Sequence, residues 1–148
     1  MFWFAWASCL ISAGYQLTVV LAAVWHRARP RPNAGSHAGI SVLKPVAGSE
    51  PEFYEAIRSH AAQDYPEFEI LFGVSGPEDA ALADIVRLQA EFPRVAIRAV
   101  HTTSDAPNRK VAKLIDLARE ARYPLLLVND ADIAVPEGYL RDVASPLA

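Results

Sequence analysis

The stretch LLLVNDADI, residues 125–133, decides the fold. Its four consecutive aliphatic residues, 125–128, are typical of a strand that is buried on both faces of a sheet. Asn129, Asp130 and Asp132 follow directly. Carboxylates are rarely buried without a partner, because removing a charge from water is costly. The stretch therefore predicts a central strand whose carboxyl end delivers two acidic side chains to a polar site.

Similar short apolar runs recur upstream, and helical patterns separate them. Strands that alternate with helices specify a largely parallel sheet with helices on both faces, so the predicted fold class is α/β. Ser49 is expected to cap the first helix of this part of the chain. The predicted strands are residues 40–45, 68–75, 95–101 and 124–130, and the predicted helices are residues 49–63, 80–92, 110–121 and 136–147.

The N-terminal segment predicts a membrane span. Residues 1–26 contain no Asp, Glu, Lys or Arg, and Trp3, Trp6 and Trp25 lie near the ends of this segment. As a helix, residues 2–25 would reach about 36 Å, which exceeds the hydrocarbon core of about 30 Å. A cleaved signal peptide is the alternative, but the segment is long and lacks a basic leading region. We therefore predict a retained transmembrane helix over residues 1–26.

Basic residues follow the predicted span on one side only. Arg27, Arg29 and Arg31 lie in a Pro- and Gly-rich stretch that predicts a linker over residues 27–39. The positive-inside rule then places the N-terminus outside and residues 40–148 in the cytoplasm. The expected location is thus a membrane, with a cytoplasmic α/β domain held against the bilayer.

Composition excludes several classes of function. The net charge is −3 and the basic residues form no patch, so nucleic acid is not an expected partner. Cys9 is the only cysteine, which excludes a disulfide framework and a cysteine-based zinc site. The chain has neither a G-x-G-x-x-G nor a G-x-x-x-x-G-K-[ST] motif, so no dinucleotide or P-loop cradle is expected.

Charged and polar residues gather where the predicted strands end. In open parallel sheets, ligands bind beyond the carboxyl ends of the strands. Acids and bases would therefore meet at one rim, as an anionic ligand bound with a metal ion requires. The residues delivered there are Lys44 and Pro45, Ser75 to Asp79, Asn108 to Lys110, and Asn129, Asp130 and Asp132.

The acidic pair, Asp130 and Asp132, is the strongest of these signals. On an extended segment, side chains two residues apart point the same way, so the two carboxylates could share one Mn²⁺ or Mg²⁺ ion. The alternative is a turn that only ends the strand. Lys110, at a helix start, suits a diphosphate but could be a solvated lysine. Asp79 could be no more than a favourable partner of a helix dipole.

Four segments carry a resemblance to a known family: SVLKPVAGSEP, DYPEFEILFGV, NRKVAKL and NDADI followed by VPEGYL. In this order and spacing they resemble the ceramide glucosyltransferase group of family 2-like glycosyltransferases, and most of all the bacterial hopanoid biosynthesis-associated enzymes. The resemblance implies a GT-A-like, Rossmann-type sheet over residues 40–148. It also implies an inverting enzyme of the bacterial inner membrane that transfers a sugar from a UDP-sugar to a lipid hydroxyl.

The resemblance also implies roles for particular residues. Pro45, Asp79, Lys110 and Asp130 would bind the nucleotide-sugar, and Asp130 with Asp132 would hold the divalent cation. The catalytic aspartate and the Q/R-x-x-R-W motif of the family lie further downstream. The base is therefore expected beyond residue 148, and the chain is expected to be the N-terminal portion of a longer enzyme.

Two other functions remain open at this stage. One is a nucleotidyltransferase-like enzyme, which would need a Gly-rich phosphate loop after the first strand, where only Gly48 occurs. The other is a catalytically inactive, membrane-tethered regulatory or interaction domain. The sequence leaves the sugar and the acceptor lipid undetermined.

Overall fold

The computed structural model describes residues 2–28, 38–46, 48 and 51–145. The chain divides into two compact units, residues 1–32 and 33–148, which we describe separately. The predicted cap Ser49 and most of the predicted linker lie outside the described residues.

The first unit contains one long helix, α1 (Phe2–Ala28). Within it, Trp6–Ala28 is long and apolar enough to cross a membrane, with a mean hydropathy of 1.7. The helix carries apolar residues around its whole circumference rather than along one face. The prediction of one apolar N-terminal helix of membrane-spanning length is confirmed.

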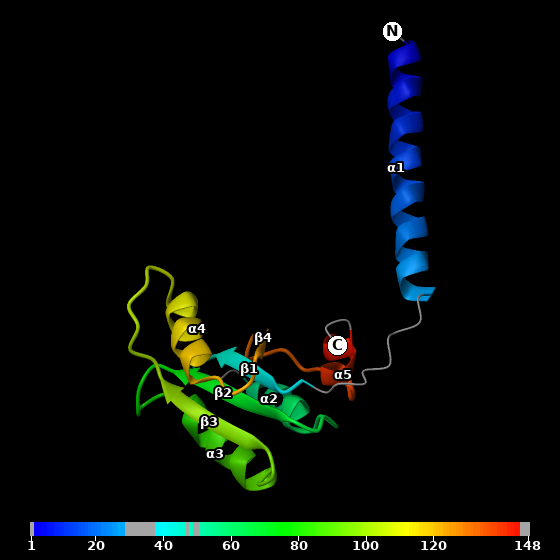
Figure 1. The fold of residues 1–148 in the computed structure, drawn as a ribbon. Helices are drawn as coiled ribbons and strands as arrows, with labels where there is room; N and C mark the ends of the chain where they lie inside the picture. The colour runs from blue at the N-terminus through cyan, green and yellow to red at the C-terminus, as the bar shows by residue number, and fades with distance from the viewer. Residues whose placement is uncertain (1, 29–37, 47, 49–50, 146–148) are drawn as a thin grey trace. The chain divides into compact units, whose positions relative to one another are not determined.

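The second unit is an alternating α/β domain, and its elements match the predicted ones to within a few residues (Figure 1). Four strands and four helices follow one another in the described residues. They are β1 (Ile40–Pro45), α2 (Phe53–Ala61), β2 (Phe68–Val74), α3 (Ala81–Glu91), β3 (Ala96–His101), α4 (Arg109–Glu120), β4 (Leu125–Val128) and α5 (Tyr139–Ala144).

The four strands form one parallel sheet in the order β3-β2-β1-β4. The chain moves outward from β1 to β3 and then crosses back to place β4 on the other side of β1. This reversal is a topological switch point, and ligands of such sheets bind in the crevice beyond the strands that flank it. The fold therefore directs attention to the carboxyl ends of β1 and β4.

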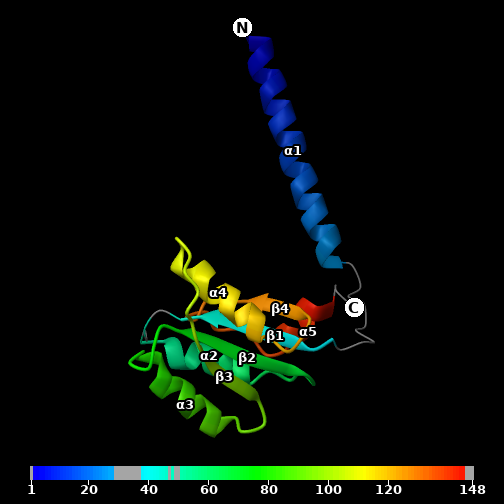
Figure 2. The same ribbon diagram turned by 60° about the vertical axis from the view of Figure 1, so that its left-hand side comes forward.

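Helices cover both faces of the sheet (Figure 2). Helix α4 packs on β1 and β2 through a small cluster of buried leucines, Leu43, Leu71 and Leu117. The opposite face carries the larger core, to which α2, α3 and α5 contribute Phe53, Ile57, Ile85, Leu88 and Leu140. The central strands β1 and β2 are buried on both faces. Strand β4 was predicted to be central and buried on both faces, and this prediction is wrong: β4 lies at the edge of the described sheet, and its Leu126 and Val128 side chains are about half exposed.

Candidate functional site

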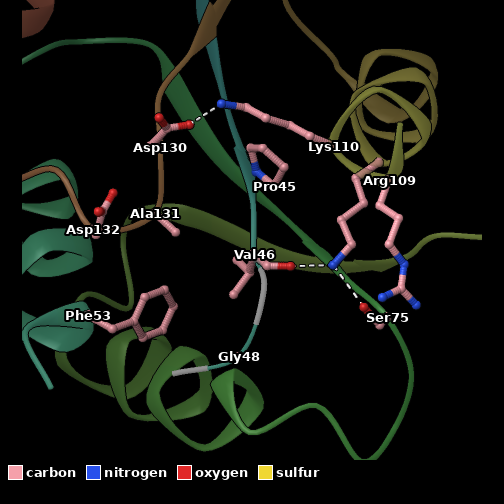
Figure 3. A pocket seen from close by; sticks show the side chains of 11 residues that line it. Pro45, Val46, Gly48, Phe53, Ser75, Arg109, Lys110, Asp130, Ala131 and Asp132 are labelled. Carbon is pink, nitrogen blue, oxygen red and sulfur yellow. Dashed lines mark hydrogen bonds and ion pairs between the residues drawn. The ribbon is translucent and has the colours of Figure 1, made fainter. Parts of the chain in front are cut away.

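A cavity with a volume of about 520 Å³ lies at the switch point of the described domain (Figure 3). Its walls come from the end of β1, the start of α4 and the turn after β4. Phe53 and Val46 supply apolar surface, whereas acidic and basic side chains face one another across the opening. The lining residues are Pro45, Val46, Gly48, Phe53, Ser75, Arg109, Lys110, Lys113, Asp130, Ala131 and Asp132.

The acidic pair lines this cavity, but its backbone differs from the prediction. Strand β4 ends at Val128 rather than Asp130, and residues 131–132 form a turn, so the expectation of an extended segment is wrong. The last bond to β1 runs from the Asn129 N–H to the Leu43 carbonyl oxygen, at 3.2 Å. Pro45 has no N–H with which β1 could continue the pairing toward β4. The proline therefore ends β4, and the chain is free to turn the two carboxylates into the cavity.

A buried lysine fixes this turn from below. Lys44 is fully buried, and its Nζ donates a hydrogen bond to the backbone oxygen of Asp130, at 2.9 Å. Burial lowers the pKa of Lys44 to about 8, against the opposing effect of the negative charges of Asp132 and Asp130. The first strand thus places a cationic group directly beneath the acidic pair.

The start of α4 supplies the basic wall. Asn108 caps the helix, because its side-chain oxygen accepts hydrogen bonds from the backbone N–H groups of Lys110 and Val111, at 2.9 and 3.3 Å. The Lys110 ammonium forms an ion pair with the Asp130 carboxylate across the cavity (Figure 3). Both side chains are about half exposed, so this pair can be exchanged for contacts with a ligand.

Lys113 is a site residue that sequence reasoning missed. Its Nζ donates to the backbone oxygen of Val46 and to Ser75 Oγ, the latter at 2.8 Å, and so it connects the ends of β1 and β2. Burial lowers the pKa of Lys113. The available signal was spacing, because residues three apart on a helix share a face and Lys113 follows Lys110 by three.

Asp79, in contrast, holds its own turn. Its carboxylate accepts hydrogen bonds from the backbone N–H groups of Ser75, at 2.9 Å, and of Ala81, at 3.2 Å. Asp79 is not among the residues that line the cavity, whereas Pro45, Lys110, Asp130 and Asp132 are. The structure thus brings together four of the five predicted site residues and puts Asp79 at the start of α3.

The donor set fits a cation that is shared with a ligand. No cluster of three or more His, Cys, Asp or Glu residues suited to a metal ion occurs among the described residues. The acidic pair nevertheless offers hard oxygen donors to one cavity. Mg²⁺ and similar ions typically take one or two carboxylates and complete their coordination with water and phosphate oxygens. Two carboxylates facing three cationic side chains suit a metal-bound phosphate ligand.

Structural comparison supports the fold. The chain is similar to the mannosyltransferase PcManGT of Pyrobaculum calidifontis, with a TM-score of 0.68 and 21% identity over 90% of this chain and 39% of that one. It is also similar to S. aureus TarS solved in complex with UDP, with a TM-score of 0.54 and 26% identity over 72% of this chain and 31% of that one. Together with the observed sheet, these likenesses establish a GT-A-like fold.

Sequence comparison identifies the family. Ceramide glucosyltransferase 1 of Caenorhabditis elegans is 31% identical over 124 residues, which cover 82% of this chain and 26% of that protein. The Candida albicans ceramide glucosyltransferase is 29% identical over 72% of this chain and 22% of its own length. The chain thus spans about a quarter of these relatives. The model of glycosyl transferase family 21 matches residues 4–148, and the chain belongs to that family.

Proposed function

We propose that this chain is the donor-binding half of a membrane-anchored, inverting glycosyltransferase that moves a sugar from a UDP-sugar to a lipid hydroxyl. The observation that carries the proposal is one cavity in which Arg109, Lys110 and Lys113 face the acidic pair. Cationic side chains can bind a diphosphate, and carboxylates can bind its metal ion. Family membership supports sugar transfer, and the ceramide glucosyltransferase relatives support a lipid acceptor. By the family resemblance, we propose a ceramide-like or hopanoid-like alcohol.

The diphosphate would lie at the start of α4. Helix N-termini favour anions through their backbone N–H groups and dipole, and Lys110 adds a full positive charge there. On binding, the Lys110 ammonium would leave Asp130 for the diphosphate, so one weak surface ion pair is exchanged for a charge-assisted contact. The UDP complex of TarS supports uridine as the nucleoside of the donor. Pro45 would contact the nucleotide-sugar, and Asp79 is the proposed uridine contact.

The acidic pair would hold the divalent cation, Mn²⁺ or Mg²⁺. When bound, such an ion supplies charge neutralisation for the departing UDP diphosphate. Asp130 is well suited to this role because its backbone is held by Lys44 while its carboxylate remains half exposed. Among the described residues, Lys110 is the hydrogen-bond partner of that carboxylate, so a metal ion would displace a single contact.

Acceptor chemistry requires a further part of the enzyme. In a single displacement, a base takes the proton of the lipid hydroxyl, the oxygen attacks the anomeric carbon, and the bond to UDP breaks. We assign no base within residues 1–148, and we place it downstream by family resemblance. Helix α1 would hold the domain at the cytoplasmic face, with Arg27 on that side, so that the bilayer presents the acceptor.

A transfer assay on the complete gene product tests this function. The protein is incubated with radiolabelled UDP-sugars, a membrane lipid extract and Mn²⁺, and labelled lipid is separated by extraction. We expect transfer by the wild type, loss of transfer with a chelator, and loss in Asp130→Asn. The exposed loop variant Asp105→Asn serves as a matched control and should retain activity. Absence of transfer with every donor and lipid would favour the regulatory-domain alternative.

A further inference from the structure

A network of hydrogen-bonded polar side chains adjoins the cavity. It includes a buried histidine that plays no part in the proposed ligand contacts. His60, on α2, is fully buried, and Asn129, directly before the acidic pair, is nearly so. The Asn129 Nδ2 lies 3.1 Å from His60 Nε2, and Asn129 Oδ1 accepts a hydrogen bond from the Tyr139 hydroxyl at 3.2 Å. Three elements, α2, the β4 turn and α5, are thus joined at one amide.

The hydrogen-bonding pattern fixes the tautomer of the histidine. His60 Nδ1 lies 3.0 Å from the backbone oxygen of Ala56, and a carbonyl oxygen can only accept, so Nδ1 must carry the proton. In the neutral ring, Nε2 is then an acceptor and faces the amide donor of Asn129. Reversing the Asn129 amide would set two acceptors against each other and would leave the Tyr139 hydroxyl without its acceptor. The arrangement is therefore self-consistent in one orientation.

We propose that His60 is a positioning residue for donor binding: through Asn129 it fixes the backbone from which Asp130 enters the cavity. This inference rests on the proposed function insofar as the acidic pair binds a metal and a nucleotide. Burial and the nearby Lys44 charge lower the pKa of His60 to about 4, so the ring stays neutral and keeps Nε2 as an acceptor near neutral pH.

Four contacts hold the backbone of this short segment and its buried amide. The backbone N–H of Asn129 is held by Leu43, its side chain by His60 and Tyr139, and the backbone oxygen of Asp130 by Lys44. The contacts of Leu43 and Lys44 are ordinary supports of a strand end and a turn. The contacts of His60 and Tyr139 reach the segment from helices α2 and α5, and the His60 contact is the more deeply buried of the two. A buried polar network of this kind specifies one geometry, since partial satisfaction would be costly.

Variants of His60 separate positioning from packing. His60→Phe keeps an aromatic ring but removes the acceptor, and His60→Gln can return an oxygen to Asn129. In the chain purified in detergent, we expect His60→Phe to speed hydrogen exchange at the backbone N–H of Asn129 by about tenfold. We expect the same variant to weaken Mn²⁺-dependent UDP binding, also by about tenfold. His60→Gln should recover to within about threefold of the wild type. Tyr54 lies on α2, like His60, but its hydroxyl donates to Glu91 of α3. Tyr54→Phe should therefore leave both readouts unchanged.

A combined variant adds a further distinction. His60→Phe with Asn129→Leu is made in a Tyr139→Phe background, so that all three polar partners of the network are removed. Thermal stability should then return toward the wild-type value while UDP binding stays weak. Recovery of UDP binding along with stability would overturn the inference, because a merely structural role predicts that result. Equal exchange rates at Asn129 in the wild type and in His60→Phe would overturn it as well.

The ring tautomer is measured on the unaltered protein, so the inference can be tested even if a variant fails to fold. Long-range proton–nitrogen correlation spectra of the ¹⁵N-labelled chain should show His60 protonated on Nδ1 and bare on Nε2 near neutral pH. A proton on Nε2 would contradict the network. If the wild type bound no UDP, the proposed function would fail, whereas the tautomer and the exchange rates would still decide the role of His60.

Discussion

Acidification should destabilise the α/β domain through His60. Burial and the charge of Lys44 lower the pKa of this histidine from 6.5 to about 4 in the folded state. As the pH falls through 6.5, unfolded His60 takes up a proton that folded His60 binds only near 4, so stability is lost in the window between the two values. Integrating the two titrations from about pH 7 to about pH 4.5 gives a loss of about 2 kcal/mol.

The loss is measurable by denaturation. With a urea dependence of about 1–3 kcal/mol per molar, the midpoint should fall by about 1–2 M over this pH range. Trp3, Trp6 and Trp25 all lie in α1, so tryptophan fluorescence would report that helix rather than the domain. Hydrogen exchange in β1 and β2, followed by mass spectrometry at increasing urea, reports the domain itself.

Two variants control this experiment. His60→Phe should flatten the pH dependence, because the titrating group is gone. His101→Gln, which replaces an exposed histidine at the end of β3, should keep it. A midpoint that did not change with pH, or a pH dependence that persisted in His60→Phe, would show that His60 does not cause the loss of stability in acid.

Three further predictions follow from the same structure. Lys110→Met should weaken UDP binding by about tenfold while leaving uridine binding unchanged, as calorimetry would show, because the ammonium is proposed to meet the diphosphate; equal losses for both ligands would contradict this. Gly39→Ala should lower the free energy of unfolding by about 1–3 kcal/mol, measured by urea denaturation, because a methyl group there would lie 2.1 Å from Tyr123 Cδ1; an unchanged midpoint would mean that the ring moves freely aside. In sealed right-side-out vesicles, residues after 40 should resist added protease, and their digestion would show that the proposed orientation is wrong.

Sequence patterns predicted the strands of the sheet because burial favours runs of apolar residues. Apart from Ser41, Lys44 and Glu69, the residues of β1 and β2 are apolar, since each strand has a helical layer on either side. The apolar run of β4 predicted a central strand, but β4 lies at the edge of the described sheet with one face about half exposed. A second rule located the cavity: ligands of open parallel sheets bind where the carboxyl ends of the strands meet, at one edge of the sheet. The end of β4 was predicted two residues too late, because it depends on Pro45 in the neighbouring strand.

The support of the site was beyond sequence reasoning for a physical reason. His60 and Asn129 are 69 residues apart, and no local periodicity relates a helix residue to a turn so far along the chain. A lone histidine carries the same sequence signal whether it is exposed, like His101, or fully buried, like His60. Lys113 was within reach, since it shares a helix face with Lys110, but its contact with the end of β1 required the fold.

The most direct test of the proposed function is calorimetric titration of UDP into the detergent-solubilised 148-residue chain, with and without Mn²⁺. We expect binding that requires Mn²⁺, is abolished by a chelator and is lost in Asp130→Asn, while Asp105→Asn binds as the wild type does. Binding that is independent of Mn²⁺ and unchanged in Asp130→Asn would contradict the assignment of the acidic pair.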